Sequence, residues 1–168
     1  MIKNSIWTVI FSAIAALLQS VLLYRLTIYG AIPDFSLGVL VFSAYVNGTM
    51  SGQISGFFSG LFYDFLSASP MGLHTFVRTV IGAAAGLLKG MFFLDKVVLP
   101  MFLCASSTIL KALLLFGLNF LFAEIVPSYP SLTSPVFWVE LLLNTFTAPF
   151  LFGFLKLFTP LLASGEKT

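Results

Sequence analysis

The chain has 168 residues, of which 59% are hydrophobic and only 8% are charged, and its formal net charge is +2. About a quarter of the residues of an average soluble domain are charged, so this composition excludes an ordinary soluble protein and predicts one all-α integral membrane unit over residues 1–168. The small charge and the lack of basic runs exclude nucleic-acid binding. Cys104 is the single cysteine, which excludes an internal disulfide and a cysteine-based metal site.

Apolar runs separated by turn signals predict a bundle of six transmembrane helices. The first run follows Lys3, has the length of a spanning helix and shows no cleavage site near Arg25, so we expect it to be retained. The uncharged stretch 35–63 is too long for one span, and Asn47-Gly48-Thr49 interrupts its apolar pattern, which favours two short helices and a tight turn. The expected helices cover roughly residues 5–24, 33–46, 50–66, 73–93, 97–122 and 136–158.

The distribution of basic residues predicts the orientation of the bundle. Six spans place both ends of the chain on the inner side of the membrane, with Arg25 and Arg78 on the outer side, as the positive-inside rule prefers. A single span over 35–63 would exchange only the sides of Lys3 and Arg25, so charge alone leaves five spans open. The residues then expected on the inner side are Lys3, Lys89, Lys96, Lys156 and Lys167.

Two glycine ladders predict a close helix pair at the centre of the bundle. Glycines recur every four residues on the third expected helix and again on the fourth, and such bare stripes let two membrane helices approach closely. The alternative is that glycine is merely frequent in membrane helices. The expected packing residues are Gly48, Gly52, Gly56 and Gly60 on one helix, with Gly82, Gly86 and Gly90 on the other.

Polar side chains at membrane depth are the candidate sites, because each costs free energy there. We expect Lys111 to find Glu140 or Asn144 on the next helix, with Asn144 the better match in depth, and Asp64 to pair with Arg78. For both pairs a structural role and a transport or catalytic role are open. Asp34, after Pro33, is a helix-start signal, and Gln19 is either an interhelical hydrogen-bond partner or an interfacial amide.

Enzymatic chemistry has little support in the sequence. One histidine, His74, and one cysteine exclude a paired-histidine metal motif and a dithiol motif. The segment Gly56-Phe57-Phe58-Ser59-Gly60 loosely resembles a serine nucleophile motif, but Ser59 belongs to the glycine ladder and packing explains it more simply. We therefore expect no catalytic residue, no metal and no cofactor.

The pattern of polar and small residues in the first half of the chain resembles the MreD family, a small membrane subunit of the bacterial rod-shape system, the elongasome. The residues that carry the resemblance are Gln19, Pro33-Asp34, Gly52, Gly56-Phe57, Gly60-Leu61, Asp64 and Gly72. The resemblance implies a noncatalytic inner-membrane scaffold that binds the bitopic protein MreC and acts with MreB, RodA and its penicillin-binding protein in peptidoglycan synthesis. It also implies a fold similar to the substrate-binding subunits of energy-coupling-factor transporters.

Two functions from different classes follow. The first is the scaffold, which contacts membrane lipids and docks MreC through its helix surfaces and outer loops. The second is a transporter subunit that binds a vitamin near Lys111, Glu140 and Asn144 and docks through a stripe of small residues on the first helix. The stripe is Ser12, Ala16 and Ser20.

Overall fold

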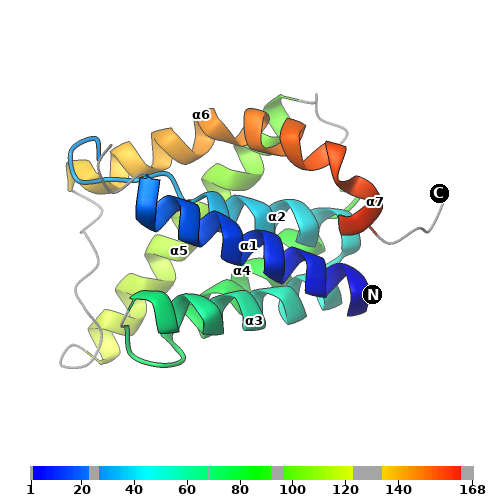
Figure 1. The fold of residues 1–168 in the computed structure, drawn as a ribbon. Helices are drawn as coiled ribbons and strands as arrows, with labels where there is room; N and C mark the ends of the chain where they lie inside the picture. Colours follow the sequence, from blue (N-terminus) through cyan, green and yellow to red (C-terminus); the bar gives the residue numbers. More distant parts are fainter. Residues whose placement is uncertain (1, 23–26, 68, 92–96, 123–133, 164–168) are drawn as a thin grey trace.

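The computed structural model describes residues 2–22, 27–67, 69–91, 97–122 and 134–163. These residues form helices and no β-strand, and one isolated bridge joins Ile28 to Ala31 between the first two helices. Figure 1 shows the longer helices side by side in one bundle. The helices are α1 (Ile2–Leu22), α2 (Phe35–Asn47), α3 (Thr49–Ser67), α4 (Leu73–Leu87), α5 (Val98–Leu121), α6 (Pro135–Leu157) and the short α7 (Thr159–Leu162).

The uncharged stretch 35–63 folds as two helices rather than one. The chain breaks at Gly48, which ends α2 with a φ of 95°, a conformation that glycine adopts without strain. Figure 1 shows α3 running back alongside α2 after this break. The tight turn expected at Asn47-Gly48-Thr49 is therefore present, and Gly48 both forms the turn and lies against α4, where a Cβ added to Gly86 would be 2.6 Å from the Gly48 carbonyl carbon.

Three helices are long and apolar enough to cross a membrane by length and composition, namely α1 over Lys3–Val21, α5 and α6. Helices α2 and α4 are shorter apolar helices, with 13 and 15 residues. Their side chains form much of the core, where Leu40, Val41 and Ile81 are completely buried. Helix α2 is thus enclosed by its neighbours, whereas α4 buries one face and leaves Phe76 and Leu87 exposed.

The structure differs from the sequence expectation at the end of α4 and after α6. Helix α4 ends at Leu87 rather than near residue 93, and Gly90 adopts a φ of 73° in the turn beyond it. Helix α7 was not expected; it follows α6 directly and packs against α1. Arg25, Lys96 and Lys167 lie outside the described residues.

Helices α3 and α4 cross at backbone contact along most of their length. A Cβ atom added to Gly52 would overlap the carbonyl oxygen of Gly82, and one added to Gly82 would overlap that of Gly52. At Gly60 an added Cβ would lie 2.5 Å from the Cα of Thr75, and at Gly86 it would lie 2.5 Å from the Cα of Thr49. Such distances leave no room for a side chain, so the glycines are what permits this crossing.

A buried row of small polar side chains, which sequence reasoning missed, fixes α1 against its neighbours. The hydroxyl of Ser5 lies 3.1 Å from that of Ser51 on α3, and the hydroxyl of Thr8 lies 2.5 Å from that of Ser43 on α2. Ser12 donates to the carbonyl of Ser36 at 3.3 Å. Their spacing of three to four residues, continued by Ala16 and Gln19, is the helical period that would have indicated a buried face.

Candidate functional site

The candidate site is built around Asp34, the residue that precedes α2. Helix α2 begins near the level of Lys111, which lies in the middle of α5, so its first turn is enclosed by other helices. The Asp34 carboxylate accepts a hydrogen bond from the Leu37 amide at 2.9 Å, and the Asp34 amide donates to the Asn144 side chain at 2.7 Å. These bonds satisfy backbone groups that a helix start leaves unpaired inside the bundle.

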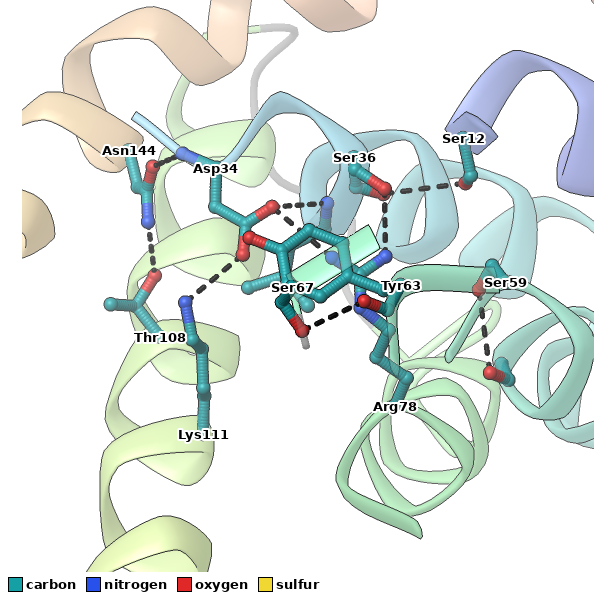
Figure 2. A network of polar contacts seen from close by, with 12 residues as sticks. Ser12, Asp34, Ser36, Ser59, Tyr63, Ser67, Arg78, Thr108, Lys111 and Asn144 are labelled. Carbon is teal, nitrogen blue, oxygen red and sulfur yellow. Dashed lines mark hydrogen bonds and ion pairs between the residues drawn. The ribbon is translucent and has the colours of Figure 1, made fainter. Parts of the chain in front are cut away.

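Two cations from other helices approach the same carboxylate, as Figure 2 shows. Lys111 of α5 lies 3.0 Å from Oδ2 of Asp34, and Arg78 of α4 lies 3.4 Å from Oδ1. Lys111 also pairs with Glu140 of α6 at 2.7 Å. The four groups carry two positive and two negative charges, and we call them the Asp34 network.

Arg78 is held by further contacts on the opposite side of Asp34 from Lys111. Its side chain is 3% exposed, donates to the Ser36 hydroxyl at 2.7 Å and lies 4.3 Å from the centre of the Tyr63 ring. A guanidinium over an aromatic face is favourable, and more so when water is excluded. Each charged side chain of the Asp34 network therefore has at least one oppositely charged partner on another element.

Of the two partners expected for Lys111, Glu140 is confirmed and the preference for Asn144 was wrong. The lysine stem spans the difference in depth and reaches Glu140, while the Asn144 amide donates to Thr108 of α5 at 3.0 Å and accepts from Asp34. The sequence could not place Asp34 here, because its position depends on how far α2 is recessed into the bundle. With Asp34 present, Lys111 has two carboxylates to neutralise its charge.

The expected ion pair between Asp64 and Arg78 is also wrong. Arg78 pairs with Asp34, whereas Asp64 accepts from the amides of Gly72 at 2.9 Å, His74 at 2.8 Å and Thr75 at 3.2 Å. The Thr75 hydroxyl adds a fourth hydrogen bond at 2.7 Å. Asp64 is thus the cap of α4, supplied by α3, because the residue at the start of α4 is a glycine with no side chain to do so.

The remaining sequence candidates are the glycines of the two ladders and Gln19. Gly52, Gly56, Gly60, Gly82 and Gly86 lie in the α3–α4 crossing. Gly90 was wrongly assigned to it, since it lies beyond α4 with no atom within 4 Å of an added Cβ. Gln19 is buried near the end of α1 and does not belong to the Asp34 network.

The geometry supports a structural site better than a reactive one. The hollow beside Asp34, Thr108 and Asn144 has a volume of about 10 Å³, which is room for about one water molecule. The described residues include no group of three His, Cys, Asp or Glu side chains that would hold a metal ion. The Asp34 network instead links α4, α5 and α6 to the start of α2 through ion pairs among its own side chains.

Comparison with known families decides the class of the chain. The model of the family described as rod shape-determining protein MreD matches residues 1–158. The chain belongs to the MreD family. No curated protein and no solved structure matches it. As a member of this family it is a rod shape-determining membrane protein, in agreement with its apolar helices.

The structure gives the two aspartates that carry the sequence resemblance a common role. Asp34 caps α2 and Asp64 caps α4, the two shorter apolar helices of the bundle. Both helices begin where their first amides have no partner within the helix. A carboxylate placed at each start satisfies these amides and interacts favourably with the helix dipole.

Proposed function

We propose that this MreD-family chain is a noncatalytic scaffold subunit of the bacterial cell-wall elongation complex and that it binds the bitopic protein MreC. The observation that carries the proposal is the family match over residues 1–158, which covers every long helix. Through MreC the chain acts with MreB, RodA and its penicillin-binding protein in the control of peptidoglycan synthesis.

The internal bonding of the bundle supports a scaffold rather than an enzyme. The side chains of Asp34, Arg78 and Asp64 are buried and bonded within the chain, and the adjoining hollow of about 10 Å³ does not admit a substrate. A group that is partnered on all sides is poorly placed to take up or release a proton during a reaction. Docking of another protein needs only the outer surface.

The surface of the bundle supports contact with a membrane helix. An apolar groove of about 540 Å³ lies between α1, α2 and α6, and it is lined by aliphatic and aromatic side chains such as Phe11, Leu18 and Phe154. In lipid, two such surfaces associate through close packing rather than through the hydrophobic effect. We expect the single membrane helix of MreC to use a surface of this kind.

In this proposal all six longer helices cross the inner membrane, with both chain ends in the cytoplasm and a fold related to the substrate-binding subunits of energy-coupling-factor transporters. The start of α1 and the ends of α4 and α6 then carry Lys3, Lys89 and Lys156 to the inner side. The recessed α2 spans because its neighbours enclose it, and the short α4 spans with one face packed on α3 and α2 and the other toward lipid.

The vitamin-binding alternative has weaker support. Ser12 and Ala16, two members of the stripe that would dock a transport partner, are buried inside the bundle and 1% and 4% exposed. The region near Lys111 and Glu140 is occupied by their mutual ion pair and by Asp34. A vitamin would have to break this pair or bind elsewhere.

Co-purification tests the proposal directly. The chain is expressed with MreC, one of the two carries an affinity tag, and the extract in mild detergent is passed over gel filtration. We expect a stable complex, and we expect it to be lost when the membrane helix of MreC is replaced by that of an unrelated single-pass protein. Separation of the two folded proteins would refute MreC binding, and recovery of a stoichiometric vitamin would favour the transporter.

A further inference from the structure

The ends of α1 and α3 enclose a polar hollow that the Asp34 network does not use. Its volume is about 190 Å³, and it lies on the side of α1 that faces α3. We call it the Gln19 hollow. Its polar lining consists of Gln19 and Ser20 on α1 with Tyr63 and Ser67 on α3, and Ile32 and Leu66 contribute apolar surface.

Gln19 is the unusual residue of this hollow. Its side chain is 9% exposed, and its carbonyl oxygen is buried without a hydrogen-bond partner in the part of the chain that the structure describes. Buried polar atoms are nearly always paired, so an unpaired acceptor indicates a missing donor. The last torsion of a glutamine side chain is broad and roughly two-fold, so the amide can turn its oxygen toward a donor that enters the hollow.

The two serines of the hollow also offer acceptors rather than donors. Ser20 gives its hydroxyl proton to the carbonyl of Leu17 at 2.9 Å, and the Ser67 hydroxyl lies 2.8 Å from the carbonyl of Tyr63 and 2.9 Å from the Ser69 hydroxyl. The Ser20 oxygen keeps its lone pairs for a donor, and the Ser67 oxygen keeps at least one. Among the described residues no charged side chain lines the hollow, and the face of Tyr63 is occupied by Arg78. The site therefore selects for hydrogen-bond donors and not for a phosphate or a carboxylate.

The position of the hollow indicates where the donor comes from. Gln19 and Ser67 lie near the ends of membrane helices, where lipid headgroups begin, and the adjacent Val21 is 70% exposed. We propose that the Gln19 hollow binds the headgroup of a phospholipid whose terminal group donates hydrogen bonds. The ammonium of phosphatidylethanolamine is the simplest such group. Phosphatidylcholine carries the same charge but has no N–H donor, so it makes a matched comparison.

Lipid selection by the purified chain tests this inference. The chain is placed in nanodiscs with equal amounts of phosphatidylethanolamine and phosphatidylcholine of the same acyl chains, and the lipids that remain bound after release are counted by native mass spectrometry. One added hydrogen bond predicts enrichment of phosphatidylethanolamine by roughly fivefold to tenfold over the bulk ratio. Bound lipid at the bulk ratio of the two lipids would overturn the proposal. The hollow would then hold water, a polypeptide or nothing rather than a selected headgroup.

Substitutions at Gln19 test whether the preference for phosphatidylethanolamine arises in the Gln19 hollow. Gln19→Leu should reduce the enrichment to the bulk ratio, whereas Gln19→Glu, which keeps acceptor oxygens, should retain it. Gln53→Leu is the matched control, because Gln53 is an exposed amide toward the other end of α3. Enrichment that persists in Gln19→Leu, or that disappears equally in Gln53→Leu, would overturn the assignment to this hollow. The wild-type comparison of the two lipids stands even if Gln19→Leu fails to fold.

Discussion

Helix α4 contacts its two main neighbours by opposite means. Against α3 it presents bare backbone, so that Gly82 meets Gly52 with no side chain between them. Against α2 it presents the buried guanidinium of Arg78, which is neutralised by Asp34. The first contact depends on the absence of atoms and the second on a balance of charges, so the two should fail in different ways when they are altered.

The two regions meet at Arg78. Its carbonyl group lies against Gly56 of α3, where an added Cβ would be 2.8 Å from the Arg78 carbonyl carbon, and its side chain extends into the Asp34 network. The glycine crossing therefore fixes the backbone from which the guanidinium reaches Asp34. A change in the crossing is expected to disturb the network, whereas loss of one charge need not separate α3 from α4.

The largest effect is expected from Asp34→Ala. This change leaves Arg78 and Lys111 with one carboxylate between them and removes the cap of α2, and breaking a buried ion pair costs about 3–5 kcal/mol. The measurement is the midpoint of thermal unfolding in detergent, followed by loss of helical signal. Asp34→Asn is the control that keeps an acceptor for the Leu37 amide while removing the charge. An unchanged midpoint in Asp34→Ala would show that the network contributes nothing to stability.

Gly56→Leu is expected to come second. The leucine side chain cannot fit against the backbone of Arg78 and Thr79, so α3 and α4 must move apart, and such overpacking costs about 1–3 kcal/mol or more. Gly60→Leu should act alike at Thr75. Both variants should also reduce recovery of the complex with MreC, which is measured by co-purification.

Gly153→Leu is the matched control for these glycine variants. Gly153 lies on α6, and nothing stands within 4 Å of an added Cβ. The same substitution there should leave the unfolding midpoint close to wild type. An equal decrease of the unfolding midpoint for Gly56→Leu and Gly153→Leu would mean that leucine destabilises any glycine position. The close crossing of α3 and α4 would then not explain the effect at Gly56.

A double substitution sharpens the electrostatic side of the comparison. Within the Asp34 network, Lys111→Met alone leaves two carboxylates facing Arg78, and Glu140→Gln alone leaves two cations facing Asp34. Together the two changes remove one charge of each sign and keep the pair of Arg78 with Asp34. The double variant should therefore lose less stability than the sum of the single variants, with a coupling of about 0.5–3 kcal/mol. Strict additivity in the unfolding midpoints would contradict a shared network.

The same comparison explains which parts of the structure the sequence could predict. A ladder of glycines is a local, periodic signal, so the pairing of α3 with α4 and the break at Gly48 follow from spacing alone. The partners of Arg78 and Lys111 do not, because they depend on the depth at which α2 begins, and that depth is set by contacts among four helices. Helix ends near Gly90 were misplaced because an apolar run does not reveal where a turn starts.

The role of Asp64 was missed for a related reason. The sequence predicts an ion pair for this carboxylate at the end of an uncharged stretch, but its hydrogen-bond donors are amides at the start of α4, eight to eleven residues later. Gly72 at the start of α4 was the available signal, because a helix that starts without a capping side chain needs an acceptor from elsewhere. The buried serines and threonine of α1 carried a periodic signal that could have been found.

The smallest effect is expected from Ser59→Ala, which tests whether the serines beside the glycines add to the crossing. The Ser59 hydroxyl is buried, but it donates only within its own helix, to the carbonyl of Gly56 at 3.3 Å. Alanine keeps the small volume, and the carbonyl keeps its helical hydrogen bond, so the change should stay within about 0.5 kcal/mol of wild type. The unfolding midpoint and recovery with MreC should both be preserved. A loss as large as that of Gly56→Leu would mean that polar contacts, rather than bare backbone, hold α3 against α4.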